Sequence, residues 1–239
     1  MAGPPSVPPL DPGLRDSRRA VLSPRATPLL IAEVQQIETL FVRTETSSPE
    51  RPRMMWRLAE DYVELASAEA REQKTSAERA RVERAKKVEK AARLTAIKYY
   101  RRLEGEYPRF CYKGTAPATP NAGCLDEVLY FMGLEYEALG DYPEARKVYF
   151  SLLKGFPQSA LIPLVYFGFG ELFLKEAQAE PGKWSLALRA YGKAAEYSGS
   201  SIVAAARGRI AFACDATDAG ASEPELCAQR GAAGTKIAE

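Results

Sequence analysis

The 239-residue sequence contains no histidine. Without histidine there can be no Ser-His-Asp or Cys-His nucleophile system, no histidine general base and no metal site with imidazole ligands. No apolar run reaches the roughly 18 residues of a membrane-spanning helix, so we expect no transmembrane segment. The net charge of +2 is too small for a dedicated nucleic-acid-binding protein, and we expect no nucleic-acid partner.

Carboxylates and thiols do not replace the missing histidine. Glu60, Asp61 and Glu64 lie near one another on one predicted helix, but nothing in the sequence brings another carboxylate across a cleft from them. The four cysteines include no Cys-x-x-Cys pair, so a zinc site is not expected. We therefore expect a protein that is not an enzyme and that holds no metal or other cofactor.

Strong helix formers dominate the residues that are present, and apolar residues recur at helical spacing. Leu30, Val34 and Phe41, for example, share one face of a helix predicted over 29–43. No segment alternates as a strand would, so we predict an all-α fold. The motif Thr75-x-x-Glu78 has the form of a capping box and predicts a helix start or a kink. A further helix is predicted to start at Ser48–Glu50 and to continue through Leu65. The other predicted helices cover 78–106, 125–139, 143–155, 162–179, 183–197, 201–214 and 223–230.

The two ends of the chain differ in composition from the rest. Residues 1–28 hold seven of the 17 prolines, and we expect them to form a flexible lead-in that is not helical. This lead-in has no apolar core of the kind an export signal needs. Gly231–Glu239 is small and polar, and we expect it to be frayed.

One spacing pattern occurs three times along the predicted helices. A large residue, a small residue and an aromatic come first, and a small residue four positions before an aromatic follows on the next helix. The small residues allow two helices to approach closely, and the aromatics fill the space between them. The copies are Met55-x-x-Leu58-Ala59-x-x-Tyr62 with Ala96-x-x-x-Tyr100, Leu129-x-x-Met132-Gly133-x-x-Tyr136 with Ala145-x-x-x-Tyr149, and Tyr166-x-x-Phe169-Gly170-x-x-Phe173 with Ala187-x-x-x-Tyr191.

These copies, with the turn glycine Gly140 and the closing proline Pro157, resemble the tetratricopeptide repeat (TPR) of about 34 residues. The resemblance covers roughly residues 51–197. It implies a TPR-like α-solenoid of about three helix pairs, the first with a long charged helical insertion. An ordinary helical bundle is the alternative. The implied domains are a lead-in over 1–28, a TPR-like domain over 29–197 with pairs at about 50–108, 125–158 and 162–197, and capping helices with a tail over 198–239.

More narrowly, the chain looks like cell-envelope TPR proteins of myxobacteria and related bacteria, some of which serve gliding motility or outer-membrane assembly. The residues that carry this likeness are Leu30–Val34, Arg57–Leu65, Ala96–Tyr100 and Asp126–Tyr130. The likeness implies a periplasmic or cell-envelope protein, and a cytoplasmic TPR adaptor is the alternative.

The TPR resemblance also implies a non-catalytic scaffold, which presents the first helix of each pair to a peptide or helix of another envelope component. Each residue that would face this partner could instead pack against the next repeat. The groove-facing candidates are Trp56, Glu60, Tyr130, Leu134, Glu137, Phe167, Glu171 and Leu174.

The predicted helix at 78–106 overlaps a strongly basic stretch of the sequence. Residues 71–104 hold 12 Lys and Arg against five Glu, a net charge of +7, so the rest of the chain carries −5. We expect either a solvated helix face or an arm that docks to an anionic polymer, lipid headgroup or acidic protein. The arm would make the chain a structural subunit of a larger envelope complex, with Arg84, Lys87 and Lys90 as candidate contacts.

The cysteines form two pairs of equal spacing. Twelve residues lie between Cys111 and Cys124, and twelve between Cys214 and Cys227. Each pair can close a local loop as a disulfide, which would stabilise the fold by ~3 kcal/mol and would fit an oxidising compartment such as the periplasm. Four unpaired thiols in a cytoplasmic protein are the alternative.

Overall fold

The computed structural model of the chain describes residues 7–16, 18, 25–111, 125–177, 179–216 and 223–228. Every regular element within these residues is a helix, as predicted. The chain forms two compact units. We call residues 21–159 the central unit, and residues 160–239 together with residues 1–20 the C-terminal unit.

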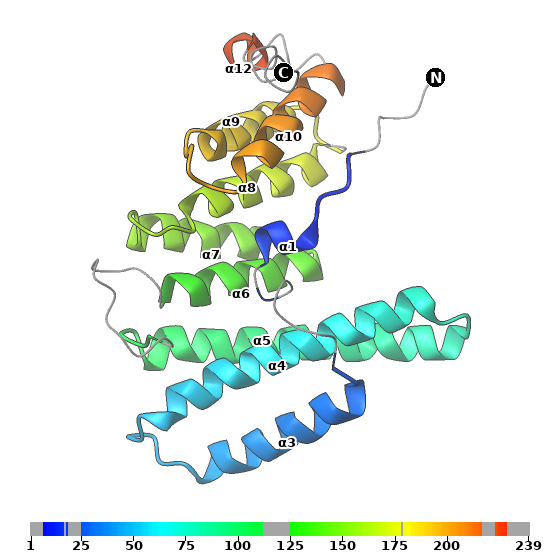
Figure 1. Cartoon of the computed structure of the whole chain (residues 1–239), viewed down its shortest axis with the longest axis vertical. Helices are drawn as coiled ribbons and strands as arrows, with labels where there is room; N and C mark the ends of the chain where they lie inside the picture. Colours follow the sequence, from blue (N-terminus) through cyan, green and yellow to red (C-terminus); the bar gives the residue numbers. More distant parts are fainter. Residues whose placement is uncertain are drawn as a thin grey trace, which may run out of the picture. The chain divides into compact units, whose positions relative to one another are not determined.

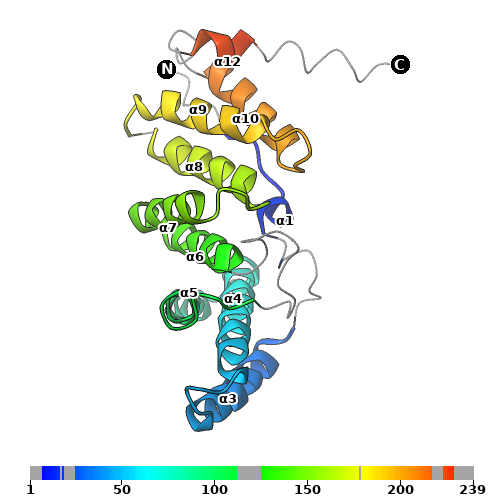
Figure 2. The ribbon, with the colours of Figure 1, turned by 90° about the vertical axis from the view of Figure 1, so that its left-hand side faces the viewer.

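The central unit is a series of helices that pack in chain order. The helices are α3 (Thr27–Arg43), α4 (Glu50–Thr75), α5 (Arg79–Glu106), α6 (Leu125–Leu139) and α7 (Tyr142–Gly155). Each packs chiefly against its neighbours in the sequence, and Figure 2 shows them following one another in that order. Packing between sequence neighbours is the mark of a solenoid, so this unit has the predicted solenoid-like arrangement.

The C-terminal unit combines the third predicted helix pair with the predicted capping helices. It contains α8 (Ile162–Glu176), α9 (Lys183–Ala195), α10 (Val203–Ala216), α12 (Pro224–Ala228) and, from the start of the chain, α1 (Pro12–Arg15). Here α8 packs on α9, α9 on α10, and α12 on both α9 and α10. The units therefore divide after Ser159, whereas the sequence predicted a boundary after residue 197.

Glycines hold the two helices of a pair at close range. A Cβ atom on Gly133 would lie 2.2 Å from the ring of Tyr149, and one on Gly170 would lie 2.3 Å from the ring of Tyr191. Both tyrosines are fully buried. Glycine and tyrosine occupy the same places in the second and third copies of the pattern, so one seam between helices occurs twice in the chain.

The predicted charged insertion is a lengthening of both helices of the first pair. Helices α4 and α5 have 26 and 28 residues, against 15 and 14 in α6 and α7. The end of this hairpin extends past α3 and α6 (Figure 1). The prediction of a helix start near residue 78 is confirmed, but the predicted capping box is wrong. Thr75 belongs to the last turn of α4, where its hydroxyl donates to the carbonyl of Arg71 at 3.1 Å.

Part of the proline-rich lead-in is helical, which corrects the expectation that it is not. Pro12 begins the single turn of α1, a position where proline fits because its missing N–H has no helical acceptor. The Asp11 side chain caps this turn by accepting from the Gly13 N–H at 2.9 Å. The expected frayed tail, Gly231–Glu239, lies outside the described residues.

Candidate peptide-binding surface

The structure leaves none of the eight predicted groove residues exposed. Three of them, Glu60, Leu134 and Glu171, are half-buried. The others are buried, namely Trp56, Tyr130, Glu137, Phe167 and Leu174. The expectation that these side chains line an open groove is therefore corrected, and what covers them differs between the two units.

In the central unit the helices themselves cover the predicted groove residues. The Trp56 ring lies 6.0 Å from the ring of Phe131, which belongs to the next helix pair, and 6.0 Å from that of Tyr100. Glu137 accepts a hydrogen bond from the hydroxyl of Tyr149 at 2.5 Å. For Trp56 the alternative stated above, packing against the next repeat, describes the structure.

In the C-terminal unit Phe167 and Leu174 belong to the apolar core, and the first described residues of the chain pack on that core. Residues 7–16, which we call the N-terminal segment, lie against this unit. Val7, Leu10 and Leu14 pack on the apolar core to which Phe167 belongs. The guanidinium of Arg15 lies over the Phe167 ring, with its carbon 5.7 Å from the ring centre. Phe167 and the half-buried Glu171 are thus part of a surface that already holds a short stretch of chain.

A buried arginine on α10 binds the backbone of this segment. Nη1 of Arg209 donates to the carbonyl oxygen of Pro8 at 2.6 Å. The same guanidinium donates to Glu171 through Nε at 2.7 Å and through Nη2 at 3.3 Å. Since Glu171 fixes the plane of the guanidinium, the remaining N–H groups are aimed before any chain arrives.

Tyr191 completes the polar part of the surface. Its hydroxyl donates to Glu171 at 2.7 Å. Burial, together with the negative charge of Glu171, raises the pKa of Tyr191 well above its usual value. The phenol therefore stays a hydrogen-bond donor at neutral pH.

Another arginine of the lead-in, Arg25, pairs with carboxylates of the central unit. The sequence analysis did not predict these contacts. Arg25 pairs with Glu64 and Glu33, and its Nη2 lies 2.8 Å from Asp61. Arg57 pairs with Glu33 at 2.7 Å and with Asp61 at 3.1 Å. These contacts join the start of α3 to the middle of α4.

The pKa values in this cluster shift in opposite directions. Burial raises the pKa of Asp61, although the hydrogen bond from Arg25 opposes the shift. The hydrogen bond from Arg57 lowers the pKa of Glu33. The α4 carboxylates of this cluster, Asp61 and Glu64, are thus paired with guanidinium groups. In the part of the chain that the structure describes, no cluster of Cys, Asp and Glu is arranged to hold a metal ion.

The predicted docking residues lie on the exposed side of the projecting hairpin. Arg84, Lys87 and Lys90 are all exposed. Other cations of the hairpin are paired, Arg81 with Glu72 at 3.1 Å and Lys86 with Glu83 at 3.0 Å. Lys87 and Lys90 form no ion pair with any described residue, so their charges face solvent.

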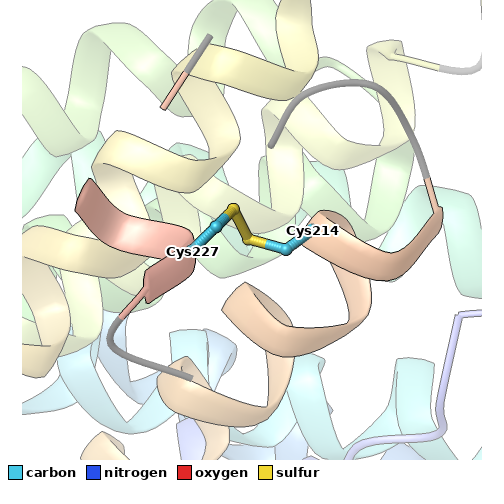
Figure 3. Close-up of a disulfide and its surroundings, with 2 residues drawn as sticks. All are labelled: Cys214 and Cys227. Atoms are coloured by element: carbon cyan, nitrogen blue, oxygen red, sulfur yellow. A yellow bond between two sulfur atoms is a disulfide. The ribbon is translucent and has the colours of Figure 1, made fainter. Parts of the chain in front are cut away.

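One of the two predicted disulfides can be described. Cys214, near the end of α10, is bonded to Cys227 of α12, with Cα atoms 5.7 Å apart (Figure 3). The bridge ties the short α12 to the rest of the C-terminal unit. Cys124 lies outside the described residues, so its predicted bond with Cys111 stays a prediction.

Comparison with known proteins adds no relative. No protein family, no curated protein and no solved structure matches this chain. Among the described residues, no helix has both the length and the apolar character needed to cross a membrane.

Proposed function

We propose that the chain is a non-catalytic, TPR-like interaction scaffold that binds an extended peptide of another protein on its C-terminal unit. One observation carries the proposal: the buried Arg209 holds the backbone of a short chain segment across α8 and α10. A backbone carbonyl is present in every peptide, whereas the apolar contacts beside it depend on sequence. The surface thus combines a general backbone anchor with selective apolar contacts.

The seams between paired helices support the TPR-like part of the proposal. Gly133 with Tyr149 and Gly170 with Tyr191 repeat the same close approach at equivalent places of the pattern. A repeated pair can place its first helix beside a ligand each time it occurs. In the C-terminal unit that helix is α8, which supplies Phe167 and Glu171.

The proposed compartment is the bacterial periplasm or another part of the cell envelope, within a motility or assembly complex. The bond between Cys214 and Cys227 supports this, because structural disulfides persist in oxidising compartments. A cytoplasmic adaptor would instead contain reduced cysteines. Counting thiols in protein extracted under acid quench from the cells that make it separates the two.

Selection from a library of random peptides displayed on phage tests the scaffold. We expect selected peptides to bind the full chain with micromolar affinity and to lose about tenfold on the variant Phe167→Leu. Phe150→Leu is the matched control, because Phe150 is exposed on α7 of the other unit. The same selection is run on the variant Leu10→Asp/Leu14→Asp, in which the N-terminal segment no longer fits the surface. If neither the wild type nor this variant selects a binder, the proposed function is refuted.

A second candidate function rests on the projecting hairpin. Lys87 and Lys90 are exposed and unpaired there, and Leu94, which is 49% exposed, follows on the same face of α5. Some acidic residues lie among the cations of the hairpin, as in the ion pairs made by Glu72 and Glu83. A patterned surface of this kind fits an acidic protein better than a uniformly charged lipid surface.

A further inference from the structure

We propose that the N-terminal segment is a built-in ligand, which occupies the peptide-binding surface until a partner segment of the same chemistry displaces it. This inference rests on the proposed function and names both the class of ligand and the state of the surface. It starts from a simple fact of topology: Pro8 and Arg209 are in contact although 201 positions separate them in the sequence.

The segment is seated as a ligand would be. Val7, Leu10 and Leu14 are half-buried against the unit, whereas Pro8 and Pro9 between them are exposed. Apolar side chains three and four positions apart therefore face the core of the C-terminal unit. The ligand class that follows is a short segment that is extended at its start and ends in one helical turn, with apolar residues at this spacing, prolines between them and an arginine directly after the last apolar residue.

Proline makes such a segment a good ligand for a physical reason. Its ring fixes φ near the extended conformation, so less conformational entropy is lost when the segment binds. Grooves with aromatic walls recognise proline-rich segments in this way. Here the aromatic wall is Phe167, and the Arg15 guanidinium rests on its face.

The unit can release the segment without losing its own core. Helices α8, α9 and α10 pack on one another directly, and α1 takes no large part in that packing. On release Arg209 keeps both hydrogen bonds to Glu171 and loses only the carbonyl of Pro8, which water can replace. Displacement by a competing segment therefore leaves the ion pair of Arg209 with Glu171 in place.

A labelled synthetic peptide of residues 7–16 tests the proposal on the full chain. In the opened variant Leu10→Asp/Leu14→Asp the chain's own segment no longer fits the apolar seat. We expect this variant to bind the peptide at least about tenfold more tightly than the wild type, because a tethered ligand competes at high effective concentration. Fluorescence anisotropy gives both dissociation constants, and a peptide with aspartate at both leucine positions is the control ligand.

Further variants locate the site and guard against misfolding. Adding Phe167→Leu to the opened variant should weaken peptide binding about tenfold, with the helical circular dichroism unchanged. If the opened variant does not fold, Leu14→Ala alone removes one of the segment's three apolar contacts with the seat and should still raise the peptide affinity about threefold. Equal affinity of the wild type and the opened variant, or no binding to a folded opened variant, would overturn the proposal.

Competition separates this inference from the proposed function. Library peptides that bind the C-terminal unit but are not displaced by the peptide of residues 7–16 would overturn the built-in ligand and leave the scaffold standing. Binding of the residue 7–16 peptide to an opened variant that selects nothing from the library would make the segment a structural part of the unit. That outcome would refute the scaffold.

Discussion

Gly170 and Tyr191 lie so close together that a methyl group on the glycine would overlap the tyrosine ring, 2.3 Å from its nearest carbon. The same relationship joins Gly133 to Tyr149 at 2.2 Å. In both pairs the tyrosine hydroxyl donates to a carboxylate of the facing helix, Glu171 or Glu137. Each seam therefore combines a close apolar contact with a fixed polar one, and each should tolerate little change.

Alanine at either glycine should destabilise the protein. Gly170→Ala and Gly133→Ala force a methyl group into a buried tyrosine ring, and we expect the free energy of unfolding to fall by about 1–3 kcal/mol for each. Gly105→Ala is the matched control, because nothing lies within 4 Å of its added Cβ atom. Alanine favours the helix there, so this control should be neutral or more stable by up to about 1 kcal/mol. Equal effects at all three positions in urea unfolding would contradict the seam.

Removing Arg25 should cost more than removing an exposed arginine. Arg25→Ala leaves Glu64 buried without its main partner and deprives Asp61 of one of two guanidinium contacts, so we expect a loss of about 2–4 kcal/mol. Arg53 pairs with Glu50 in solvent, and Arg53→Ala should change stability by less than about 1 kcal/mol. Chemical denaturation at neutral pH measures both, and similar losses would show that the Arg25 cluster adds nothing.

The sequence predicted the helices and their seams because both depend on local spacing. Apolar residues every three or four positions give helix limits within a few residues, and the prediction of Leu125–Leu139 matches α6 at both ends. Gly133 and Tyr149 are likewise only 16 positions apart, on adjacent helices joined by a short turn. Nearest-neighbour packing thus turns sequence spacing into contacts.

The candidate surface could not be predicted in the same way. The prolines of the lead-in indicate an extended chain, but no periodicity connects Pro8 with Arg209 or Arg25 with Glu64. The burial of Trp56 also escaped prediction, because an aromatic side chain at that position fits a groove and a seam between pairs equally well. Only the position of Phe131 decides which of the two it occupies.

Acid should weaken the Arg25 cluster through Glu33. The folded state lowers the pKa of Glu33 below its usual value of 4.5, so its ionised form stabilises the fold above that pH. This contribution is lost as the pH falls through the lowered pKa. Glu33→Gln should therefore reduce stability at neutral pH and flatten the loss of stability below pH about 4.5.

Asp61 has the opposite sign and provides the internal check. Its pKa is raised by burial, so its ionised form costs stability at neutral pH, and protonation recovers that cost as the pH falls. Asp61→Asn should therefore steepen the loss of stability in acid, where Glu33→Gln flattens it. Urea denaturation of both variants across the acid range measures the two slopes, and equal slopes would refute the assignment.

Charge reversal on the projecting hairpin should separate its function from that of the peptide-binding surface. Arg84→Glu/Lys87→Glu/Lys90→Glu removes exposed cations from α5, so we expect binding to poly-L-glutamate, used as an acidic probe, to fall at least about tenfold. Binding of the residue 7–16 peptide in the opened background should be unchanged, because none of these residues belongs to the C-terminal unit.

The matched control for the charge reversal changes Arg43, Lys154 and Arg207 to glutamate. These residues are exposed on other helices, and their reversal gives the same change in net charge. If this control loses as much, net charge alone drives the binding and the hairpin is only a solvated surface. If the hairpin variant instead loses binding to anionic vesicles but not to poly-L-glutamate, the partner is a lipid surface, contrary to the acidic protein proposed here.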